Sequence, residues 1–172
     1  MVAGDTGDDG GVAESVGRLT AGDDQQRAEA AEALCRLGAK ALPATVALVT
    51  ACADADQRVR EWATAALEDL GPPPPETIPA LVTLAGSAGP LVAYWAVTLL
   101  GRSGKDAATA VTVLAGCLES SADAALRQRA AWALGKIGPA AAAARAALSR
   151  AEKAADPRLA RLAGEALAVI GR

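Results

Sequence analysis

The 172-residue chain contains no histidine and no phenylalanine, and aromatic residues make up only 2% of it. The missing histidine removes the commonest general base, the commonest metal ligand and the usual partner of a catalytic nucleophile. With few aromatics, the 52% of residues that are hydrophobic must build a core mainly from alanine, leucine and valine. Alanine and leucine are strong helix formers, and few stretches alternate as strands do. The composition therefore predicts an all-α protein without a sheet.

Cysteines are also scarce. Cys35, Cys52 and Cys117 are too few and too far apart for a disulfide framework or a zinc site, and we interpret them as free thiols. No apolar run of the length of a membrane span and no secretion signal is evident. These absences predict a cytoplasmic protein that has no metal, no cofactor and no contact with a membrane.

Charge is distributed unevenly along the chain. Residues 1–56 carry a net charge of −6, residues 57–122 carry −2 and residues 123–172 carry +5, for a total of −3. Solvated helix faces explain most distributions of this kind. The alternative is that the acidic and basic parts of the chain attract the opposite end of another copy or a charged partner.

A repeated pattern runs through the sequence at a nearly constant period. Each helix-like stretch ends at a glycine, with a leucine about one helical turn before it and an alanine about two turns before it. The glycines are Gly38, Gly71, Gly104, Gly138 and Gly171. The leucines and alanines fall on one face of a helix, which predicts a shared core position in every copy.

An aspartate stands at the same distance before the glycine in four of the five copies, where it can cap the start of a helix: Asp23, Asp56, Asp123 and Asp156. A second apolar helix follows each of the first four glycines. We predict repeats at residues 23–55, 56–88, 89–122, 123–155 and, in part, 156–172, with an N-terminal half repeat at 12–20. They amount to about ten helices in a single domain over residues 11–172, after a disordered tail at 1–10.

The stretches DADQRVREWATAALEDLG, DAALRQRAAWALGKIG and DPRLARLAGEALAVIG resemble HEAT repeats of the short, phycobilisome-lyase-like type. The resemblance covers residues 12–172, although the third copy lacks both the aspartate and the arginine of the pattern. It implies a right-handed α-solenoid of about five helix pairs, with the first helices outside and the second helices lining a concave face. The resemblance is specific for fold and carries no particular activity.

Every aromatic side chain lies at a position that is polar or variable in the other copies, which predicts an outer flank. One interpretation is that the tryptophans cover alanines at the seams between helices. The other is that they anchor a protein partner, because tryptophan, tyrosine and arginine dominate interface hot spots. The candidate partner-binding residues are Trp62, Tyr94, Trp95, Trp132, Arg60 and Arg129. The turn Pro72–Pro75 is predicted to be stiff and extended.

The predicted function is a non-catalytic protein-interaction module or scaffold, using the small-sided concave groove or the tryptophan-bearing flank. No residue pattern marks a catalytic site. One alternative is a bacterial enzyme, or an essential enzyme subunit, that handles a small molecule in the groove. A second alternative is nucleic-acid binding by the basic C-terminal repeats, as in HEAT-like DNA glycosylases, although the groove itself offers few cations. The basic residues of these C-terminal repeats are Arg127, Arg129, Lys136, Arg145, Arg150, Lys153, Arg158 and Arg161.

Self-association through open solenoid ends is a further possibility.

Overall fold

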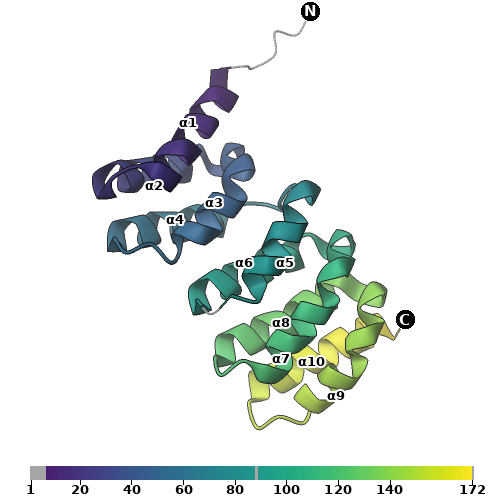
Figure 1. Ribbon diagram of the computed structural model, residues 1–172. Helices are drawn as coiled ribbons and strands as arrows, with labels where there is room; N and C mark the ends of the chain where they lie inside the picture. The colour runs from purple at the N-terminus through teal and green to yellow at the C-terminus, as the bar shows by residue number, and fades with distance from the viewer. Residues whose placement is uncertain (1–6, 88, 172) are drawn as a thin grey trace, which may run out of the picture. The chain divides into compact units, whose positions relative to one another are not determined.

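The computed structural model describes residues 7–87 and 89–171 (Figure 1). Over these residues the chain forms ten α-helices and four short 3-10 helices, and no strand, so the predicted all-α fold is confirmed. The α-helices are α1 Gly7–Ala21, α2 Asp24–Leu37, α3 Thr45–Ala51, α4 Gln57–Asp69, α5 Ile78–Ala85, α6 Pro90–Arg102, α7 Val111–Ser120, α8 Ala124–Ile137, α9 Arg145–Ala151 and α10 Pro157–Ile170. The 3-10 segments are Gly38–Ala44, Pro75–Thr77, Gly104–Ala110 and Gly138–Ala144.

The chain divides into two compact units whose boundary falls inside the proline turn, between Pro74 and Pro75. The first unit holds α1 to α4 and the second holds α5 to α10. Our expectation of one domain over residues 11–172 stays a prediction. Of the expected tail, residues 1–6 lie outside the described residues, whereas residues 7–10 form the first part of α1.

Each unit is built from helix pairs in two layers, the arrangement of an α-solenoid. In the first unit α2 packs on α4, with α1 and α3 against them. In the second unit α6, α8 and α10 pack side by side as one layer, and α5, α7 and α9 form the other (Figure 1). The predicted order of first and second helices is therefore confirmed within each unit.

The repeated aspartates cap helices as predicted. Carboxylate oxygens of Asp23, Asp56, Asp123 and Asp156 accept backbone N–H groups in the first turns of α2, α4, α8 and α10, at 2.8–2.9 Å. The third copy has Gly89 at this place and no side-chain cap. Such caps satisfy amide groups that have no partner within the helix, so they fix where each first helix begins.

The repeated alanines and leucines form the core. Ala30, Ala63, Ala96, Ala130 and Ala163 are at most 1% exposed, and so are four of the five leucines. The fifth, Leu167 near the end of α10, is half-buried. Burying a leucine side chain contributes about 1.5–3 kcal/mol, whereas the alanines contribute chiefly by letting helix backbones approach one another.

Residues 24–51 are long and apolar enough, by length and mean hydropathy alone, to cross a membrane. In the structure this stretch bends at Gly38, which has a φ of 54°, and folds as α2, a 3-10 turn and α3. Its apolar side chains include the buried Ala31, Leu34 and Leu48 of the first unit. Core helices of soluble proteins pass the same test, so this stretch is weak evidence for a membrane span.

We predict that Asp123→Ala lowers the free energy of unfolding by about 1 kcal/mol, because two amide groups at the start of α8 lose their acceptor. Asp123→Asn keeps an acceptor and should cost much less. Urea unfolding followed by circular dichroism measures both. Equal losses for the two variants would contradict a capping role.

The Asp156 cap of α10 also predicts that the free energy of unfolding depends on pH. A hydrogen bond from Gln128, together with backbone N–H groups of α10, lowers the pKa of Asp156. Its folded-state pKa lies below the unfolded value of about 3.9, so its stabilisation is complete above about pH 4 and is lost as the pH falls through the folded pKa. Asp156→Asn should therefore be less stable than the wild type at pH 7, and the difference should shrink as the pH falls below about 4. A constant difference at all pH values would contradict this assignment.

Candidate functional site

The structure distributes the predicted aromatic residues over both units and over very different environments. Trp62 lies on α4 of the first unit, where it is 37% exposed. Tyr94 and Trp95 lie on α6 and Trp132 lies on α8, all in the second unit. Tyr94 and Trp132 are half-buried. The four aromatic residues therefore do not all belong to one surface patch.

Trp95 differs from the expected outward position, because it is only 6% exposed. The reason is that α6 is apolar around most of its circumference, with Val92, Val97 and Leu99 buried besides the shared core positions. The Trp95 ring makes an edge contact with Tyr94 at 5.7 Å between centroids, and the Arg102 guanidinium lies 5.9 Å from its centroid. Trp95 is thus a core residue and an unsuitable anchor for a partner.

The guanidinium of Arg60 is also hydrogen-bonded within the fold. Its Nη1 donates to the carbonyl oxygens of Asp54 and Ala55 at 2.7 and 2.8 Å, in the loop before α4. Arg127, at the same position of the fourth copy, donates from Nε to the Leu118 carbonyl at 3.1 Å. Arginines at this position therefore stabilise the connection that precedes the first helix of a repeat.

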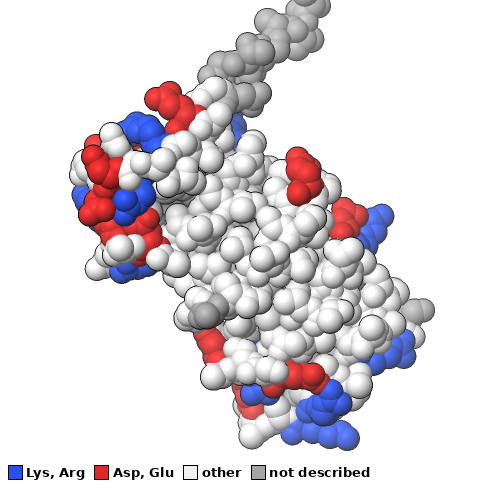
Figure 2. Space-filling model, viewed as in Figure 1, with Lys and Arg blue, Asp and Glu red and all other residues white. Residues whose placement is uncertain are grey.

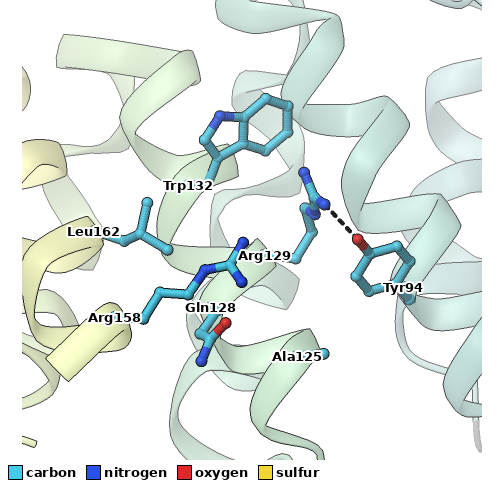
Figure 3. Close-up of a pocket in the computed structure, with 7 residues that line it drawn as sticks. All are labelled: Tyr94, Ala125, Gln128, Arg129, Trp132, Arg158 and Leu162. Atoms are coloured by element: carbon cyan, nitrogen blue, oxygen red, sulfur yellow. Dashed lines mark hydrogen bonds between the residues drawn. The ribbon is translucent and has the colours of Figure 1, made fainter. Parts of the chain in front are cut away.

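The second unit brings together three of the predicted residues, Tyr94, Arg129 and Trp132, which we call the aromatic–arginine cluster (Figure 3). The Arg129 guanidinium lies 4.9 Å from the Tyr94 ring centroid and 5.1 Å from the Trp132 ring centroid. Its Nη2 also donates a hydrogen bond to the Tyr94 hydroxyl oxygen. Contact with two electron-rich ring faces and a hydroxyl holds this cation in one orientation.

The cluster borders a small pocket of about 120 Å³ between α8 and α10. Beyond the cluster, the residues that line it are Ala125, Gln128, Arg158 and Leu162 (Figure 3). Trp132 and Leu162 also line a neighbouring depression of about 230 Å³, together with Lys136 and Val169. Gln128 was not among the residues singled out from the sequence, and Arg158 was named only among the cations of the nucleic-acid alternative. In the sequence, only the spacing of Gln128 and Arg158 on two successive first helices could have indicated that both line one pocket.

Two glycines inside helices permit close helix contacts, and one of them, Gly101, leaves room for Trp132. A Cβ atom placed on Gly101 would lie within 2.9 Å of the Trp132 ring and 3.1 Å from the Ala133 Cα. A Cβ on Gly135, one repeat later, would lie 3.2 Å from Ala166 of α10. The sequence does contain an indication of this close packing, because Gly101 and Gly135 occupy the same repeat position. The copies in the first unit have Cys35 and Glu68 at that position.

The cations of the last repeats are not equivalent. Arg127 and Arg145 donate to backbone carbonyls, and Arg150 and Arg161 pair with Glu119 and Glu165. By contrast, Arg129, Lys136 and Arg158 have no ion pair with an acidic side chain in the part of the chain that the structure describes. Lys136 lies 5.8 Å from the Trp132 ring centroid. The uncompensated positive charge thus gathers around Trp132.

The second helices present a different surface. Figure 2 shows an uncharged face over α5 and α7, with charged side chains at its margins. Toward α9 a shallow depression is lined by Leu118, Ala147 and the paired side chains of Glu119 and Arg150. The uncharged face therefore covers α5 and α7 and does not extend to the α9 end, and the small-sided concave groove stays a prediction.

The described residues contain neither a cluster of metal ligands nor a cysteine of lowered pKa. They contain no group of three or more cysteines, aspartates and glutamates placed to hold a metal ion. Burial raises the pKa of Cys52 to about 11, and it also raises the pKa values of Cys35 and Cys117. These thiols stay protonated at neutral pH and are poor nucleophiles.

Comparisons with known proteins agree with the fold. A family model of HEAT repeats matches residues 16–90, as the sequence resemblance implied. An engineered protein of known crystal structure is 28% identical, with a TM-score of 0.66 over 95% of this chain and 81% of that one. A designed armadillo repeat protein in complex with the peptide (KR)4 is 20% identical, with a TM-score of 0.68 over 94% of this chain and 82% of that one.

The complex of CpcE and CpcF of phycocyanin lyase from Nostoc sp. PCC7120 is also similar in fold. Its matching chain is 18% identical, with a TM-score of 0.57 over 91% of this chain and 98% of that one. A comparison with curated proteins found no match. At these identities the armadillo and CpcE–CpcF structures bear on the fold and not on the site.

We predict that Gly101→Ala destabilises the protein by about 1–3 kcal/mol, because the new methyl group clashes with Trp132 and the α8 backbone. Gly116→Ala in α7 is the matched control, since nothing lies within 4 Å of the methyl group there. The control should be neutral or stabilising by up to about 1 kcal/mol. Urea unfolding of both variants measures the difference, and equal stabilities would show that Trp132 does not depend on Gly101.

Proposed function

We propose that this chain, whose residues 16–90 match HEAT repeats, is a non-catalytic protein-interaction module that binds a protein partner through the outer face of α6, α8 and α10. The observation that carries the proposal is the aromatic–arginine cluster, with Arg129 between the rings of Tyr94 and Trp132. Arginine, tyrosine and tryptophan supply most of the binding energy at protein interfaces. An arginine that is already ordered loses little side-chain entropy on binding.

The competing surface is the uncharged face over α5 and α7. Small apolar residues there permit a helix or strand to approach closely, but scattered apolar surface of this kind is common on soluble proteins. This face offers no ordered aromatic or arginine anchor among the described residues. The outer face has both, so it is the better candidate. Trp62, in the first unit, is a separate exposed side chain that a partner could also contact.

The similar proteins support a role in binding in general terms. One designed armadillo repeat protein is in complex with a peptide, and CpcE is in complex with CpcF. Repeat proteins of this kind use extended surfaces to bind other chains. We include in this proposal a location in the bacterial cytoplasm, because cysteines stay free in its reducing environment and all three cysteines of the chain are free.

Two other functions are weaker. A pocket of about 120 Å³ is small beside the roughly 300–1,000 Å³ that bind drug-sized molecules, which disfavours a small-molecule enzyme at this face. Nucleic-acid binding needs several free cations along one surface, and five of the eight cations considered, Arg129 included, make contacts within the fold.

The proposal predicts that Arg129→Ala weakens binding of the partner at least roughly tenfold, as loss of a hot-spot residue does. The immobilised chain should capture a protein from a lysate of its source cells, and the affinity of that purified protein is then compared between variants. The matched control is Arg161→Ala on α10, whose side chain pairs with Glu165 and does not line the pocket. Equal affinities for both variants would place the binding surface elsewhere.

A further inference from the structure

Two guanidinium groups converge on the pocket between α8 and α10. Arg129 reaches it from α8 and Arg158 from the first turn of α10, with Gln128 below the Arg158 guanidinium in the view of Figure 3. Arg129 uses one nitrogen for the Tyr94 hydroxyl, and the side chain of Arg158 makes no hydrogen bond to another described residue. Both groups therefore have donors left for a ligand.

The acidic residue nearest to these arginines along the chain is already satisfied. Asp156 accepts the Gln128 side chain at 2.7 Å and the backbone N–H groups of Arg158 and Leu159 at 2.9 and 3.2 Å. These bonds lower its pKa, so it is ionised at neutral pH, yet its oxygens face the start of α10. It neutralises part of the local charge without pairing with either guanidinium.

The remaining walls are apolar or aromatic, except that Glu165, which is paired with Arg161, lines the neighbouring depression. Trp132 and Leu162 border both the pocket and the neighbouring depression, which continues toward Val169, itself 41% exposed. Lys136 adds a third cation beside the Trp132 ring. A ligand that fits has a negatively charged group for the arginines and an apolar group beside it for Trp132 and Leu162.

We propose, as an extension of the proposed function and resting on it, that this pocket binds a glutamate or aspartate side chain next to an apolar residue in an acidic segment of a protein partner. A carboxylate matches the two-pronged donor geometry of a guanidinium, and the pocket volume suits one side chain. The chain carries a net charge of +4 over residues 75–172, with 11 basic and seven acidic residues, which favours an acidic partner at this unit.

The test uses the full chain and fluorescently labelled peptides in which glutamate alternates with leucine. Matched peptides carry glutamine or lysine in place of glutamate, and an oligothymidylate of similar length tests phosphate. Anisotropy should show binding of the glutamate peptide that weakens with added salt, at least roughly tenfold tighter than the glutamine peptide. Arg158→Ala should weaken it roughly tenfold, because Arg158 lies exposed in the first turn of α10 and can be removed without disturbing the fold.

Arg158→Glu sharpens the test by reversing the charge, and it should bind the lysine peptide more tightly than the glutamate peptide. Lys153→Ala is the control and should change nothing, because Lys153 is exposed and lines neither the pocket nor the depression. Circular dichroism verifies that every variant is folded. Equal binding of the glutamate and glutamine peptides, or equal effects of Arg158→Ala and Lys153→Ala, would overturn the proposal. Tighter binding of the oligothymidylate would overturn it too and would assign the pocket to phosphate.

Two further outcomes separate this inference from the proposed function. If Arg129→Ala abolishes capture of a protein partner while no acidic peptide binds, the interaction module stands and the acidic specificity is wrong. If the chain self-associates in sedimentation experiments and Arg158→Ala makes it monomeric, the occupant is a second copy of this chain, and the proposal of another protein's acidic segment is overturned.

Discussion

Close approach of neighbouring first helices is the constraint on which the structure depends. Columns of buried alanine, such as Ala130 and Ala163, let backbones pack with little between them, and Gly101 and Gly135 bring the helices of the second unit closer still. In a chain without phenylalanine, leucine fills the remaining space. Large aromatic side chains have few places in such a core. Trp132 fits because Gly101 leaves room for its ring, and this fit sets the position of the whole cluster.

The candidate site is a product of that packing. Residues of α8 and α10 that do not take part in the helix contacts point outward in register, since the repeat places equivalent positions side by side. Arg129 and Trp132 come from one helix, Tyr94 from the first helix of the preceding repeat and Arg158 from that of the following one. The fold therefore combines side chains that lie a whole repeat apart in the sequence without any specialised loop. Recognition can vary at these positions while the alanine and leucine columns stay unchanged.

Local and periodic features were predictable from the sequence. The aspartate caps, the buried alanines and leucines and the order of helices follow from spacing alone. The burial of Trp95 was not predictable, because it depends on how much of α6 is covered. The role of Arg60 depends on which carbonyl oxygens lie within reach, and the pocket at Arg158 depends on side-chain orientation. Spacing constrains which residues are neighbours, whereas these outcomes depend on tertiary geometry.

The three tryptophans give the two units separate optical signatures. Trp62 is the single indole of residues 1–74 and is exposed to water, whereas Trp95 is enclosed and Trp132 lies beside two cations. Intrinsic fluorescence from the first unit should thus be red-shifted, and that from the second unit should be dominated by an apolar environment and by charge. The emission spectrum of the intact chain is a sum of distinguishable reporters, one of them located at the proposed binding surface.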